Sequence, residues 1–132
     1  KKLIYQLNLE NYIFLYGYQN GKNLEKIYTM CNIGIGPLAP HRVGGKEGTG
    51  IKTKEYFAIG LPYFFAGQEL LVPENYQYIM KIESSDSPID IQKIFEFYNT
   101  IKNDSNMQKN MRDFARKHYS WTTILKTVLM NL

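Results

Sequence analysis

Apolar residues along this chain fall either in short continuous runs or at helical spacing. Runs at 12–16 (YIFLY), 33–38 and 61–66 (LPYFFA) predict strands, the first buried on both faces, and 78–82 predicts a fourth. Apolar residues at helical spacing predict helices at 1–7, 23–31 and 50–59. Strands that alternate with helices favour parallel strands joined by right-handed crossovers.

The last third of the chain has only helical patterns. Ser87 and Pro88 predict a helix start, with serine as the N-cap and proline at the first helical position. Helical spacing continues at 107–118, and Ser120 is expected to cap a last helix. The apolar side of the first of these helices is predicted to consist of Ile91, Ile94, Phe95, Tyr98 and Ile101.

These patterns predict an α/β fold with a partial Rossmann-like, doubly wound and mainly parallel sheet. We expect about four strands, flanking helices and a helical C-terminal part. No internal boundary or repeat divides residues 1–132, so a single domain is expected. The chain opens at Lys1 in the middle of an amphipathic pattern, which predicts a fragment of a longer protein.

Several single residues carry structural expectations. Gly34 and Gly36 lie in a predicted strand and would let another group approach the backbone closely. Gly60 is expected to end the helix at 50–59, whose inner side is predicted to include Ile51, Phe57 and Ala58. Cys31, the one cysteine, is expected to be a small buried residue.

Composition and charge exclude some classes of protein. The net charge is +4, but the basic residues are dispersed, which argues against nucleic acid and leaves a phosphate-bearing ligand compatible. No apolar run approaches the roughly 20 residues of a membrane span. The sequence contains no Asp-x-Asp pair and no cysteine–histidine cluster at ligand spacing, so we expect neither a metal site nor a cofactor.

The loop at 39–49 is the best candidate for chemistry. In an open parallel sheet, ligands bind beyond the carboxyl ends of the strands, and this loop leaves such an end. Gly44, Gly45, Gly48 and Gly50 would free backbone amides to face an anion at the start of the next helix. An ordinary glycine-rich turn explains the same pattern.

Two carboxylates bracket this loop and helix. Glu47 and Glu55 have seven residues between them, a separation of roughly 12 Å along a helix, so they are too far apart to act as an acid–base pair on one bond. They would instead reach two ends of one extended ligand, since carboxylates bind sugar hydroxyls well. Alternatively, Glu47 is simply exposed and Glu55 pairs with Lys52 or Lys54.

Three basic residues near the loop are candidates for ligand binding. The Arg42 guanidinium suits a phosphate, and the His41 imidazole suits a hydroxyl or carbonyl group. Lys52 would raise the local positive potential. Structural roles are equally open for all three residues. His41 and Arg42 would then hold a long loop in place, and Lys52 would lie on a solvated helix face.

The order of four segments resembles the C-terminal half of GT-B glycosyltransferases of the family-4 type. The segments are IYTMCNIGIGPL, EGTGIKTKE, YFAIGLPYFFA and FARKHYSWTTILKTVL. The E-x7-E motif of the family matches Glu47 to Glu55, and its aromatic-Ser-Trp matches Tyr119, Ser120 and Trp121. The chain departs from the family in lacking an aromatic near Thr49, and the family's EAMA is here Glu55-Tyr56-Phe57-Ala58.

The resemblance implies a nucleotide-sugar donor site. Glu47 would contact the donor sugar as the catalytic residue, and Glu55 would hold the ribose hydroxyls. The amides of Gly48, Thr49, Gly50 and Ile51 would face the sugar and diphosphate, which agrees with the anion cradle. The His41-Arg42 insertion looks like a feature of bacterial surface-polysaccharide enzymes.

The function expected from this resemblance is the donor-binding portion of a retaining, metal-independent glycosyltransferase. Its partners would be a nucleotide-diphosphate sugar and a glycan or lipid-linked acceptor bound by a missing N-terminal domain. The parent is expected in the bacterial cytoplasm, with peripheral membrane association. We expect the chain by itself to be inactive and to dimerise through unpaired strand edges. The alternative is a non-catalytic α/β nucleotide- or protein-interaction module.

Overall fold

The computed structural model describes residues 1–44, 47–48, 50–69, 72–73 and 75–130. The chain divides into two compact units, Lys1–Met30 and Cys31–Leu132, each of which is described by itself. None of the helices in the described ranges has the length and hydrophobicity needed to cross a bilayer.

The first unit contains helices α1 (Lys2–Gln6) and α2 (Gly21–Thr29), near the predicted positions. Residues 12–16, predicted to be a buried strand, are irregular, and their exposed fractions run from 42% at Ile13 to 79% at Tyr12. A strand needs a neighbour to satisfy its backbone groups, and no described strand pairs with this segment. The prediction of a strand here is wrong.

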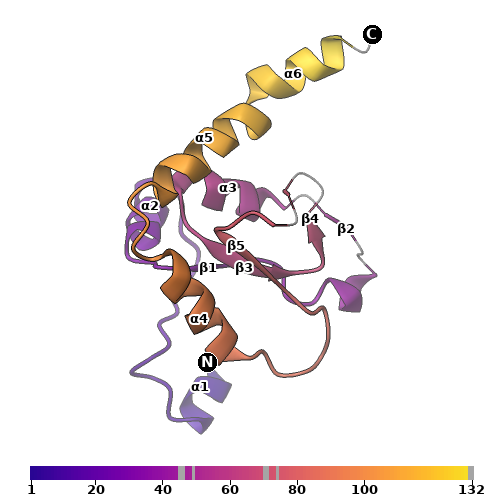
Figure 1. Cartoon of the computed structure of the whole chain (residues 1–132). Coiled ribbons are helices and arrows are strands. Elements are labelled where there is room, and N and C mark those ends of the chain that lie inside the picture. Colours follow the sequence, from indigo (N-terminus) through magenta and orange to yellow (C-terminus); the bar gives the residue numbers. More distant parts are fainter. Residues whose placement is uncertain (45–46, 49, 70–71, 74, 131–132) are drawn as a thin grey trace. The chain divides into compact units, whose positions relative to one another are not determined.

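The second unit is built on a parallel sheet of three described strands, β1 (Gly34–Ile35), β3 (Tyr63–Ala66) and β5 (Ile79–Ile82) (Figure 1). The order is β1-β3-β5, with Gly34 opposite Tyr63 and Tyr63 opposite Ile79. A separate parallel pair joins β2 (Glu47–Gly48) to β4 (Gln68–Glu69). The α/β class and parallel pairing are confirmed, while the main sheet has three strands instead of about four because 12–16 does not join it.

Helices fill most of the remaining sequence. They are α3 (Ile51–Ile59), α4 (Ile91–Ile101), α5 (Met107–Tyr119), α6 (Trp121–Leu129) and the short 3-10 helix η1 (Pro40–Val43). Gly60 ends α3 in the left-handed conformation, with φ +78°, as predicted. The Ser120 hydroxyl accepts the amide hydrogen of Thr123, which confirms it as a cap of α6.

Phe57 of α3 is the centre of an aromatic core and is fully buried. Its ring stacks on Phe114 at 4.8 Å and meets the edges of Tyr119 and Tyr63 at 5.5 and 5.9 Å. Burial of a large aromatic side chain stabilises a core, and so do stacked and edge-on contacts between rings. The other buried apolar residues of the described core are Tyr56, Leu61, Tyr63, Phe64, Phe65, Ala66, Tyr78, Ile94, Ile101, Met111 and Ala115.

Some residues predicted to be buried are exposed. Ile51 and Ala58 point away from the core, and Thr53 and Tyr56 take the inner positions of α3 instead. On α4, Ile94 and Ile101 are buried, whereas Ile91 and Phe95 are exposed. Cys31 is also exposed. Helical spacing identifies the helix, but the rotation of its face depends on neighbours that are distant in sequence.

Gly34 in β1 and Gly36 just after it do admit close neighbours. A Cβ on Gly34 would lie 2.9 Å from the Tyr56 ring, and one on Gly36 would lie 2.8 Å from the Phe65 Cβ. The Tyr56 hydroxyl then donates to the Ile35 carbonyl at 3.0 Å. The prediction of close approach is confirmed, and the approaching groups are side chains of the core.

Candidate functional site

The loops that follow β1 and β5 come together through a cluster of four polar residues. The Arg42 Nε donates to Asp86 Oδ1 at 2.6 Å, and His41 Nε2 lies 3.0 Å from the same oxygen. The other ring nitrogen, His41 Nδ1, lies 3.0 Å from the Ser84 hydroxyl. The structure therefore brings the predicted site residues His41 and Arg42 together with two residues that are more than 40 positions away.

The cluster stabilises the ionised form of Asp86. Its pKa is lowered, first by the hydrogen bond with His41 and then by the one with Arg42. Both Arg42 and Asp86 are well exposed, so solvent screens their attraction and the pair contributes little to folding stability. The two contacts at Asp86 Oδ1 link the side chains of His41 and Arg42.

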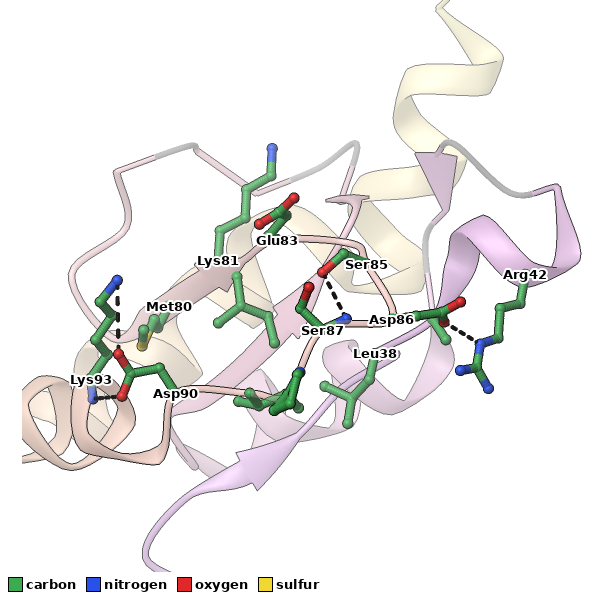
Figure 2. Close-up of a pocket in the computed structure, with 14 residues that line it drawn as sticks. Leu38, Arg42, Met80, Lys81, Glu83, Ser85, Asp86, Ser87, Asp90 and Lys93 are labelled. Atoms are coloured by element: carbon green, nitrogen blue, oxygen red, sulfur yellow. Dashed lines mark hydrogen bonds and ion pairs between the residues drawn. The ribbon is translucent and has the colours of Figure 1, made fainter.

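A pocket of about 540 Å³ opens beside this cluster (Figure 2). Leu38, which follows β1, and Met80 and Ile82 of β5 give it apolar walls. Charged groups of both signs line it, and the ion pairs Arg42–Asp86 and Lys93–Asp90 are drawn in Figure 2. Its other polar lining residues are Lys81, Glu83, Ser85 and Ser87.

The N-terminus of α3 follows the glycine-rich segment directly. Gly50 is its N-cap, and no described side chain caps it or places an acidic group in its first turn. Thr53, the buried polar residue of this turn, donates its hydroxyl to the Gly50 carbonyl at 2.8 Å. The free amides and the helix dipole make such an end favourable for an anion.

The predicted residues around this helix start are described to different extents. Ile51 and Lys52 are exposed in its first turn. Glu47 and Gly48 form β2 and pair with β4, so part of the predicted loop is a short strand. The side chain of Glu47, and Thr49 as a whole, lie outside the described residues.

Glu55 lines a second pocket, of about 450 Å³, between α3, α5 and the start of α6. Lys54, Arg112 and Arg116 surround it with positive charge, and the Tyr119 ring has the Lys54 ammonium 6.0 Å from its centre. Arg112 also donates to the Ile59 carbonyl at the end of α3. Arg42 and Glu55 thus line different pockets, and their joint action on one ligand stays a prediction.

Sequence reasoning missed Ser84 and Asp86 in the cluster beside the first pocket, and it missed Arg112, Arg116 and Tyr119 in the second pocket. The polar run at 84–87 directly after a strand was the available signal for the first pair. The described residues contain no group of three or more His, Cys, Asp or Glu side chains arranged to hold a metal ion. Comparison with models of protein families and with curated proteins finds no match for this chain.

Proposed function

We propose that this chain is the donor-binding portion of a retaining glycosyltransferase. Such an enzyme transfers a sugar from a nucleotide-diphosphate sugar to a glycan or lipid acceptor. In this proposal the unit that contains the sheet is one Rossmann-like half of a two-domain site. The proposal rests on the resemblance carried by Glu47, Glu55, Tyr119, Ser120 and Trp121, together with the geometry below.

The observation that carries the proposal is the N-terminus of α3, which follows a glycine-rich segment and which no described side chain caps. A diphosphate placed there would meet the amides of the first turn and the positive end of the helix dipole. Arg42, on the loop that leaves β1, adds a cation that suits phosphate. In open parallel sheets, ligands bind beyond the carboxyl ends of the strands. Arg42 and the start of α3 both follow the carboxyl end of β1.

Chemically, the chain's contribution would be electrostatic. As the bond between the sugar and the diphosphate breaks, negative charge grows on the leaving group. The helix N-terminus and Arg42 would stabilise that charge, Glu47 would orient the sugar, and Glu55 would accept hydrogen bonds from the ribose hydroxyls. Glu55 lines its pocket together with Lys54 and Arg116.

Replacement of Glu55 with Gln tests the proposal. Loss of charge-assisted hydrogen bonds to ribose should weaken the binding of UDP or GDP by about 1–3 kcal/mol, or roughly five- to 150-fold. Isothermal titration calorimetry measures this, and Glu96→Gln, an equal change of charge on exposed α4, serves as the matched control. Unchanged affinity in Glu55→Gln would contradict the ribose role.

A non-catalytic nucleotide- or protein-interaction module is the second candidate. The observation that favours it is the large apolar surface of α6, where Trp121 is 76% exposed and Leu125 and Leu129 are also exposed. Transfer or hydrolysis of a bound nucleotide sugar by the complete protein distinguishes the two. Nucleotide binding without any release of sugar would favour the module.

A further inference from the structure

The loops joined by the cluster of His41, Arg42, Ser84 and Asp86 do not follow neighbouring strands. In the sheet order β1-β3-β5, the strand β3 lies between the two strands that these loops leave. The contacts of Asp86 with His41 and Arg42 therefore span the carboxyl edge of the sheet over β3. Gly67, directly after β3, approaches the same region: a Cβ there would lie 2.9 Å from the Pro40 ring.

The geometry of Arg42 leaves part of its guanidinium available. Asp86 accepts from Nε, and no described residue accepts a hydrogen bond from the two terminal nitrogens. A guanidinium held through Nε by a carboxylate has fewer orientations open to it, so its terminal N–H groups are partly aligned before a ligand binds. If the Arg42 guanidinium is oriented before the ligand arrives, less conformational entropy is lost when the ligand binds.

His41 makes the arrangement more rigid. Its two ring nitrogens contact Ser84 and Asp86, so the ring ties the β5 loop to η1 at two points. Asp86 Oδ1 is shared by His41 and Arg42, which couples the positions of the two side chains. An exposed ion pair adds little stability by itself, so stability alone does not account for this arrangement.

We propose that Asp86 is a positioning residue that holds Arg42 ready to bind a phosphate group of the ligand. This inference rests on the proposed function and deepens it, because it assigns the diphosphate to Arg42 and gives the loop after β5 a role in the site. The charges that line the pocket around Arg42 and Asp86 are balanced in number: Lys81 and Lys93 are matched by Glu83 and Asp90. The orientation of Arg42, and not the net charge of the pocket, would therefore decide phosphate binding.

A double-mutant cycle on the 132-residue chain tests the inference. Affinities for inorganic pyrophosphate and for UDP are measured by NMR titration for wild type, Asp86→Ala, Arg42→Gln and the double variant. Arg42→Gln should weaken binding roughly tenfold, as expected for hydrogen bonds to a charged group. Asp86→Ala should weaken it about threefold or more in wild type and not at all in the Arg42→Gln background.

Two controls separate positioning from a structural role. Glu96→Ala removes the same charge from exposed α4 and should leave both affinities unchanged. The free energy of unfolding, measured in parallel by urea denaturation, should be alike for Asp86→Ala and Glu96→Ala, because both side chains are exposed. An equal loss of affinity for Asp86→Ala in both backgrounds, or none in wild type, would overturn the inference.

The two probes also distinguish this inference from the proposed function. One outcome is that pyrophosphate binding shows the expected coupling between Asp86→Ala and Arg42→Gln while UDP binds no more tightly than pyrophosphate. In that case the nucleotide proposal fails and the positioning role stands. If UDP binds and Asp86→Ala has no effect, the positioning role fails and the nucleotide proposal stands. A wild-type chain that binds neither probe would overturn both.

Discussion

Gly60 has both a backbone conformation and an environment that exclude a side chain. Its φ is +78°, and a Cβ would lie 2.7 Å from the Gln108 Cα and 2.8 Å from its carbonyl oxygen. Backbone atoms of α5 cannot move away without separating α5 from α3. The sequence predicts the left-handed end of α3, but not this contact, which joins residues 48 positions apart.

Gly60→Ala should therefore destabilise the fold beyond the strain of a left-handed alanine. Gly44 is the matched control, because its φ is +70° and nothing lies within 4 Å of the Cβ position. Left-handed strain is about 1–2 kcal/mol in both variants, and overpacking adds about 1–3 kcal/mol in Gly60→Ala alone. Urea denaturation measures both; equal losses would show that the contact with Gln108 is unimportant.

Asp104 gives the fold a sensitivity to acid. Its carboxylate accepts from the buried Tyr78 hydroxyl at 2.6 Å and from the Asn106 amide at 2.8 Å. The hydrogen bond with Tyr78, and then that with Asn106, lower its pKa from the ordinary value of 3.8. A lowered pKa in the folded state means that the ionised carboxylate stabilises the fold above pH 3.8 and that this contribution is lost as pH falls below it.

Asp104→Asn tests this contribution, because the amide keeps an acceptor oxygen but cannot ionise. The difference in unfolding free energy between wild type and variant should be constant from pH 5 to 7 and should shrink as pH falls below the ordinary pKa of 3.8. Urea denaturation across this pH series gives the measurement. A difference that grows on acidification would have the wrong sign for this account.

Some residues of the candidate site can be predicted from the sequence, but their contact partners cannot. His41 and Arg42 are visible in the sequence because they lie in a glycine-rich loop after a strand. Their partner Asp86 is not, because 44 positions separate it from Arg42 and only the parallel sheet brings the two loops together. Glu55 was also predicted, but its neighbours Arg112 and Arg116 come from α5, and the sequence has no local pattern that links them.

At the scale of elements, the start of α4 differs from the sequence prediction. Ser87 and Pro88 were expected to begin the helix, but Asp90 is the N-cap and accepts from the amides of Gln92 and Lys93 at 3.1 and 3.3 Å. Asp-capped and Ser-Pro starts are both favourable locally. Residues 84–87 instead belong to the loop after β5, in which Asp86 contacts His41 and Arg42.

Removal of the true cap should destabilise α4. Asp90→Ala is expected to lower the free energy of unfolding by about 1 kcal/mol, and Asp90→Ser should recover most of it because serine also caps. Ser87→Ala, at the position that the sequence favoured, should stay within about 0.5 kcal/mol of wild type. Thermal denaturation of the three variants gives the comparison, and a larger loss for Ser87→Ala than for Asp90→Ala would refute the assignment.

Strand prediction succeeded where a neighbour exists and failed where none is described. Residues 63–66 and 79–82 were predicted within two positions of their observed ends, and both lie in the parallel sheet. Residues 12–16 have an equally strong apolar pattern and form no strand. An apolar run indicates that its residues favour burial. The segment forms a strand only when a neighbouring strand pairs with its backbone hydrogen-bonding groups.

For the molecule as a whole, we propose that the carboxyl edge of the sheet binds a nucleotide diphosphate. The parallel β1-β3-β5 order, the open start of α3 and the placement of Arg42 beyond β1 support it from separate parts of the sequence. The resemblance to glycosyltransferases implies a further domain and an acceptor, and both stay predictions. Dimerisation, membrane association and a cytoplasmic location stay predictions.

An NMR titration of the chain with UDP and GDP tests this claim most directly, because each backbone amide reports its own surroundings. We expect the amides of Gly50, Ile51 and Lys52 at the start of α3 and the side chain of Arg42 to shift together with one dissociation constant. Amides of α4 around Glu96 should stay in place and serve as an internal control. The absence of shifts at millimolar nucleotide, or shifts confined to residues away from this edge, would contradict the account.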